Sequence, residues 1–81
     1  MNDKVRLRWG CRRGMLELDL LLLPFFEKEF EHLSLEEKHI FPEFLEESDQ
    51  DLYAWILNFQ KCTEPKFQSL LKKIRSHHAI H

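Results

Sequence analysis

The chain has 81 residues, 43% of them hydrophobic and 32% charged, which allows one domain with a single core and excludes a disordered chain. Its formal net charge is −2. Residues 1–14 carry five basic side chains and one acidic side chain. Residues 15–60 carry two basic and twelve acidic side chains, and residues 61–81 carry five basic and one acidic. This order favours a directional interaction surface over general affinity for nucleic acid.

The first predicted helix is short. Asn2 is a suitable N-cap, and the helix extends to about Cys11. Gly10 and Gly14, the two glycines of the chain, mark its end, because glycine readily takes the left-handed conformation that ends helices.

The second predicted helix, from about Met15 to Glu31, is amphipathic. Its apolar stripe has four-residue spacing and consists of Leu18, Leu22, Phe26 and Phe30. Pro24 lies inside this helix and predicts a kink, because proline removes a backbone hydrogen bond and crowds the preceding turn.

Two further helices follow. Ser34 and Glu37 match a capping box, and the helix that they open has a core face of Ile40, Phe41, Phe44 and Leu45. Pro42 is expected to shorten or bend it. Ser48 or Asp49 caps the next helix, whose inward side chains are predicted to be Leu52, Trp55, Ile56 and Phe59.

The fifth helix starts after Thr63, at Glu64 and Pro65. Its core side chains are Phe67, Leu70, Leu71 and Ile74, and residues 76–81 are expected to form a flexible tail. These elements predict an all-α fold, a compact five-helix bundle in which residues 1–81 form one domain.

Export and membrane insertion are not expected. Glu17 and Asp19 interrupt the leucine run, and no small-residue cleavage site follows it. The uninterrupted stretch LLLLPFF is far below the roughly 20 residues that span a bilayer. Cys11 and Cys62 lack CxxC spacing, so neither a disulfide framework nor a zinc site is indicated. The sequence does not exclude a single disulfide between them. We therefore expect a reducing, cytoplasmic location.

Arg13, Gly14 and Glu17 form a candidate site. Arg13 and Glu17 are four residues apart, so they would share one face of a continuous helix. Gly14 has no Cβ and lets another backbone approach closely, and Glu17 suits the positive end of the second helix's dipole. The spacing alone favours a simpler interpretation, which is a helix break with a surface ion pair.

Basic side chains surround a tryptophan near the N-terminus: Arg6, Arg8, Trp9, Arg12 and Arg13. Such interleaving occurs at nucleic-acid sites, but the acidic residues 15–60 would repel phosphates, so no nucleic-acid partner is expected. A solvated helix face or a hot spot for an acidic protein partner fits better. For Cys11, a buried inert thiol is favoured over a thiol whose pKa the neighbouring arginines lower.

Catalytic and metal chemistry have little support. No Ser/His/Asp or Cys/His arrangement stands out, and two glycines cannot form a phosphate-binding loop, so we expect no enzyme. His77, His78 and His81 could hold a metal, but a terminal tail rarely builds a closed shell. We therefore expect a polar tail without metal.

The stretch RLRWGCRRGMLELDLLLLPFFE, residues 6–27, resembles the signature of the small SdhE-type assembly factors of succinate dehydrogenase. Their RGxxE motif is matched by Arg13, Gly14 and Glu17. The segments LSLEEKHIF and DQDLYAWIL follow in the order and spacing of that family, and the resemblance covers about residues 4–75.

The resemblance implies a five-helix factor that promotes covalent attachment of FAD to the flavoprotein subunit of succinate dehydrogenase, and of fumarate reductase. It implies transient binding of that subunit through Arg13, Gly14 and Glu17, with Trp9, Arg12 and Asp19 beside them. FAD then belongs to the partner, and the free factor is a monomer without a cofactor of its own. The alternative is a helical adaptor or antitoxin-like module with no role in flavin attachment.

Overall fold

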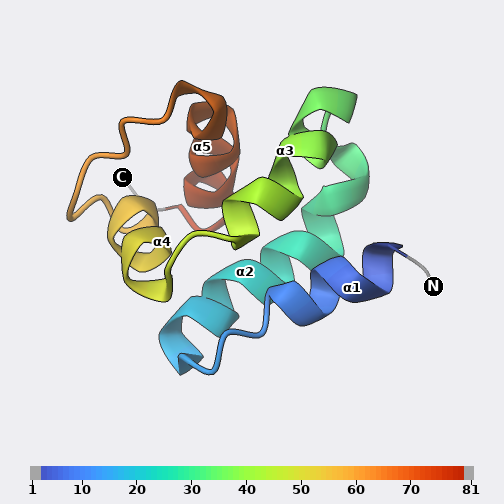
Figure 1. Ribbon diagram of the computed structural model, residues 1–81, viewed down its shortest axis with the longest axis horizontal. Coiled ribbons are helices and arrows are strands. Elements are labelled where there is room, and N and C mark those ends of the chain that lie inside the picture. The colour runs from blue at the N-terminus through green and yellow to red at the C-terminus, as the bar shows by residue number, and fades with distance from the viewer. Residues whose placement is uncertain (1–2, 80–81) are drawn as a thin grey trace.

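Five α-helices and two short 3-10 helices form the fold of the computed structural model, which describes residues 3–79 (Figure 1). The α-helices are α1 (Asp3–Gly10), α2 (Leu16–Glu29), α3 (Leu35–Leu45), α4 (Asp49–Ile56) and α5 (Gln68–His77), and the 3-10 helices are η1 (Phe30–His32) and η2 (Pro65–Phe67). Residues 3–79 contain no strand. The predicted all-α fold with five helices is confirmed, and the Cα radius of gyration of 11.6 Å is that of a compact chain.

The α1 helix lies antiparallel against α2 and η1 (Figure 1). Lys4 Nζ is 2.6 Å from Glu31 Oε1, and Arg8 Nη2 is 2.8 Å from Glu27 Oε1. Residues later in α1 therefore face residues earlier in the second helical segment. The predicted end of the first helix is confirmed to within one residue, whereas its predicted cap, Asn2, lies outside the described residues.

Neither internal proline ends its helix. The α2 helix continues through Pro24, and α3 continues for three residues beyond Pro42. Burial of the apolar side chains on either side of each proline offsets the lost backbone hydrogen bond. The second helix gives way to the tighter η1 at Phe30 instead of continuing as α-helix to Glu31. Between residues 3 and 79, no helix has both the length and the apolarity to cross a membrane.

Phenylalanine rings from α2, α3 and η2 form the centre of the core. Phe26 stacks on Phe41 with 5.8 Å between ring centroids, and Phe44 meets Phe67 edge to face at 5.2 Å. Both are favourable arrangements for aromatic pairs. The α5 helix contacts α2, α3 and α4, and its predicted core residues are all buried: Leu70, Leu71 and Ile74.

The prediction that Phe59 points into the core is wrong. Its side chain is 74% exposed and contacts only the edge of the Tyr53 ring among the aromatic side chains described, with 6.2 Å between centroids. The reason is a Schellman-type helix end. Asn58 takes a left-handed conformation with φ of 64°, and Phe59 N–H donates to the Ala54 carbonyl at 2.8 Å. The helical periodicity therefore stops before Phe59.

The α5 helix extends into the segment predicted as a tail. Ser76 is helical, and so is His77, whose ring meets Phe25 edge-on with 5.8 Å between centroids. A ring nitrogen of His78 lies 2.7 Å from the Leu21 carbonyl oxygen. His77 and His78 therefore pack against α2, because they lie three and four residues after the buried Ile74 and share its face of the α5 helix. Residues 80 and 81 lie outside the described part of the chain.

Glu37 links the start of α3 to α5. The predicted capping box is present: Ser34 N–H donates to Glu37 Oε1 at 2.9 Å, and Glu37 N–H donates to Ser34 Oγ at 3.1 Å. The buried carboxylate also accepts from Ser69 and, at 2.6 Å, from Lys73. Burial alone raises the pKa of Glu37, but these hydrogen bonds outweigh it and lower the pKa to about 2.

This carboxylate makes the stability of the fold pH-dependent. Because the folded-state pKa lies below the ordinary value of 4.5, the stabilisation is fully present above about pH 4.5 and is lost as the pH falls towards 2. The shift corresponds to about 3 kcal/mol. Urea unfolding between pH 7 and 2.5 measures the free energy of unfolding, which should fall less steeply below pH 4.5 in Glu37→Gln than in the wild type. The control Glu36→Gln, at an exposed position in the same turn, should show the same pH dependence of the free energy of unfolding as the wild type.

Candidate partner-binding site

The linker between α1 and α2 carries the predicted RGxxE residues. Residues 11–15 are not helical, and α2 begins only at Leu16. Arg13 and Glu17 therefore do not share a face of a continuous helix, and the prediction based on their four-residue spacing is wrong. The helix break of the simpler interpretation is confirmed, but the ion pair of Arg13 is formed with Asp49 instead of Glu17.

Gly14 is an exposed position with an unusual backbone. Its φ is +83°, in the left-handed region that side chains with a Cβ rarely adopt. A Cβ built on Gly14 would have no heavy atom within 4 Å. The glycine is thus required by the turn and not by crowding within the chain, and the space in front of it is open to another molecule.

The Arg13 guanidinium is bonded within the chain. Nε donates to Asp49 Oδ1 at 2.7 Å, at the start of α4. Nη1 donates to the carbonyls of Gly10 at 3.0 Å and Leu45 at 2.6 Å, and Nη2 donates to the Glu47 carbonyl at 2.9 Å. Gly10 and Leu45 are the last residues of α1 and α3, and Glu47 lies two residues beyond the end of α3. Arg13 therefore joins three helix ends, and its guanidinium donates to four acceptors within the chain.

Asp19 has a related positioning role. The Arg13 backbone N–H donates to Asp19 Oδ1 at 2.6 Å, which fixes the linker to the first turns of α2. The sequence suggested only one role for Asp49, that of an alternative N-cap of α4. Ser48 is the N-cap instead, because its Oγ accepts a hydrogen bond from Asp51 N–H at 3.1 Å. A signal for the real role of Asp49 is lacking in the sequence, because the two partners are 36 residues apart.

Glu17 is exposed beside two exposed leucines. Leu16 is 66% exposed and Leu20 is 60% exposed, and the spacing of these three residues places them together on the outer face of the first turns of α2. We call Gly14, Leu16, Glu17 and Leu20 the α2 docking surface. The two leucines were not predicted as site residues, although the sequence places them off the buried stripe of Leu18 and Leu22.

Trp9 and Arg12 are also exposed and contact each other. Trp9 is 66% exposed, and the Arg12 guanidinium carbon lies 5.8 Å from the centroid of its ring. This is the distance of a cation–π interaction, which orders two long side chains at the surface. An ordered tryptophan and arginine are suited to protein contact.

Cys11 is fully buried next to the linker. Burial raises the pKa of its thiol to about 12, and the positive charges of Arg13 and Arg8 only partly oppose this effect. The hypothesis of a lowered pKa is therefore wrong, and the buried inert thiol is confirmed. Cys11 and Cys62 are both free thiols, so the open possibility of a disulfide between them is not realised.

Within residues 3–79, no group of three or more His, Cys, Asp or Glu side chains is arranged to hold a metal ion. His81, one of the predicted histidines, is outside this range. The site is therefore characterised by an exposed glycine turn, apolar and charged side chains, and an internally bonded arginine.

Comparison with known proteins shows the family of the chain. Residues 5–78 match the protein family Sdh5, described as "Flavinator of succinate dehydrogenase". The chain belongs to this family. The Sdh5 relatives include the "FAD assembly factor SdhE" of Idiomarina loihiensis, 43% identical over 72 residues that cover 89% of this chain and 80% of the relative. The protein of the same name from Vibrio cholerae is 41% identical over 76 residues, 94% of this chain and 88% of the relative. The resemblance inferred from the RGxxE segment is confirmed at the level of the Sdh5 family.

Proposed function

We propose that this protein is an FAD assembly factor that binds the flavoprotein subunit of succinate dehydrogenase and promotes covalent attachment of FAD to it. The observation that carries the proposal is the match to the Sdh5 family over residues 5–78, together with relatives named as FAD assembly factors. The resemblance of the motif region extends the proposal to the flavoprotein subunit of fumarate reductase as a second target.

The α2 docking surface is the proposed contact with that subunit. The open space at Gly14 allows a partner backbone to approach the linker, and Leu16 and Leu20 supply apolar area that is exposed in the free protein. Glu17 lies between them and would fix the register of docking through a polar contact. Trp9 and Arg12 extend this contact, whereas Arg13 and Asp19 act as positioning residues that hold the linker in place.

The proposed role is assistance without catalysis by the chain itself. The resemblance implies that the flavin bonds to a histidine of the target, so the reacting groups belong to the partner. Binding to one domain arrangement of the partner would raise the population in which those groups lie at reacting distance. A small rigid module with an exposed docking surface suffices for this role. The two free, buried thiols favour a reducing compartment such as the cytoplasm.

Covalent flavin on the target subunit is the direct test. In a strain that lacks this gene, the flavin fluorescence of the denatured flavoprotein subunit should fall several-fold, and it should return when the gene is supplied. Equal flavin content in both strains under the same growth conditions would contradict the proposal. Binding of the subunit without any effect on its flavin would instead favour the adaptor alternative.

A further inference from the structure

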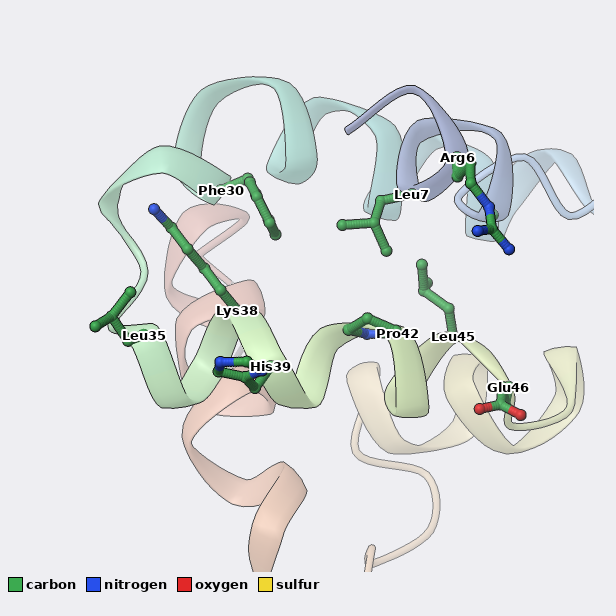
Figure 2. A pocket seen from close by; sticks show the side chains of 10 residues that line it. Arg6, Leu7, Phe30, Leu35, Lys38, His39, Pro42, Leu45 and Glu46 are labelled. Carbon is green, nitrogen blue, oxygen red and sulfur yellow. The ribbon is translucent and has the colours of Figure 1, made fainter. Parts of the chain in front are cut away.

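A groove between α1 and α3 is not used by the α2 docking surface. Its volume is about 660 Å³. Its apolar wall residues come from α1, η1 and α3 and are Leu7, Phe30, Leu35, Pro42 and Leu45. Figure 2 shows Leu7, Phe30 and Leu45 pointing toward one another across the space between the helices. We call this feature the α1–α3 groove.

The rim of the groove is mainly basic. Arg6 and His39 line it without an ion pair or side-chain hydrogen bond among the described residues. Lys38 lines it too, with Nζ 4.0 Å from Glu31 Oε2, and Glu31 is itself held by Lys4 at 2.6 Å. Lys38 is one of only two basic residues in the acidic segment 15–60. Glu46 is the single acidic residue among those that line the groove, and it lies at the same end as Arg6 (Figure 2).

Arg13 holds the two walls of the groove at one end. Its Nη1 donates to the Gly10 carbonyl on α1 and to the Leu45 carbonyl on α3. Gly10 permits a close approach there, since a Cβ on it would lie 3.1 Å from Leu45 Cδ1. The spacing of the walls is therefore set by the same arginine that positions the linker, which joins the groove to the RGxxE residues.

We propose that the α1–α3 groove is a second docking site, which takes an apolar segment flanked by Asp or Glu side chains from the same flavoprotein subunit. This proposal rests on the proposed function, because it requires that the subunit is bound. Apolar walls match the side chains of such a segment, and the charges of Arg6 and Lys38 match its carboxylates. Two sites positioned by one arginine would fix the orientation of the partner more firmly than one surface.

Site-specific photocrosslinking tests the occupant. A benzoylphenylalanine replaces Leu35, which is 78% exposed at the groove, and in separate variants it replaces Leu16 on the α2 docking surface and Lys72 on α5, away from both sites. Each variant is irradiated with the purified flavoprotein subunit before flavin attachment, and the crosslinked peptides are identified by mass spectrometry. The expected result is a crosslink from Leu35 to an apolar segment that contains Asp or Glu, a crosslink from Leu16 elsewhere on the subunit, and none from Lys72.

The other outcomes separate the two proposals. A crosslink from Leu16 alone would overturn the groove proposal and leave the proposed function standing. A crosslink from Leu35 to a second copy of this chain, or to a segment without acidic residues, would also overturn it. The absence of any crosslink to the subunit from both Leu35 and Leu16 would contradict the groove proposal and the proposed function.

Charge reversal gives a second readout. The double variant of Arg6→Glu and Lys38→Glu should weaken binding of the subunit about tenfold or more, with less salt dependence than wild type. Lys72→Glu is the matched control, and its affinity should stay within twofold of wild type. Equal affinity of the double variant and wild type would overturn the groove proposal.

Discussion

Replacing Gly14 with arginine is expected to reduce covalent flavin on the target subunit to the level of a strain without this factor. The φ of +83° makes any L-residue unfavourable there by about 1–2 kcal/mol, which lowers the melting temperature by roughly 5–10 °C in a domain of this size. The larger effect is on binding, because the new side chain fills the open space that the partner backbone needs. Affinity for the subunit and its flavin content measure this loss.

Gly14→Ala is the matched control, because a Cβ at this position touches nothing and the backbone strain is the same. The two variants should melt at similar temperatures, and the alanine variant should retain most of its binding. Equal loss of binding in both variants would show that the conformation of the linker matters more than the space in front of it. If Gly14→Arg melts far below Gly14→Ala, the glycine is needed for folding within the chain, and the open-space argument fails.

Arg13→Ala is expected to destabilise the fold strongly and to impair binding through the loss of position. The change removes four hydrogen bonds and leaves the carbonyls of Leu45 and Glu47 without these donors. Arg13 is 16% exposed and Asp49 is 37% exposed, so solvent compensates only in part. We expect a loss of about 2–4 kcal/mol in the free energy of unfolding and a fall of roughly 10–20 °C in melting temperature.

Arg8→Ala controls for the loss of an arginine at the surface. Its pair with Glu27 is about half exposed on both sides and should contribute less than about 1 kcal/mol. Arg13→Lys should recover little stability, because one ammonium cannot serve four acceptors on three helix ends. If Arg13→Ala melts within 2 °C of wild type but fails to bind, Arg13 contacts the partner and is not a positioning residue.

The helices were predictable because local physics determines them. The capping residues Ser34 and Ser48, Pro65 at the start of η2 and the apolar periodicity of α2 act over a few residues, and each is read directly from the sequence. Phe59 was misplaced because Asn58 ends the helix in a left-handed conformation that periodicity ignores. Asparagine favours that conformation, so this error had a signal in the sequence.

The sequence singled out the segment of the candidate site but not the contacts that its residues make. The RGxxE pattern marked residues 13–17 as a distinctive segment, and Gly14 is exposed as expected. The prediction that Arg13 and Glu17 share a helix face was wrong, because it assumed a continuous helix where the structure has a linker. Leu16 and Leu20 were overlooked because they belong to an apolar run, although the predicted stripe of Leu18 and Leu22 already placed them on the other side of the helix.

The helix content, most core residues, the family and the segment that carries the motif could all be predicted from the sequence alone. Helix packing is needed to explain why Arg13 turns inward to Asp49 and the ends of α1 and α3. It is also needed to explain why Leu7, Phe30 and Leu45 face one another across a groove with a basic rim (Figure 2). Helix formation depends on neighbours three and four residues apart, whereas the hydrogen-bonded Arg13 and Asp49 are 36 residues apart. Such pairs meet only when the helices pack, and one sequence carries no local signal of their meeting.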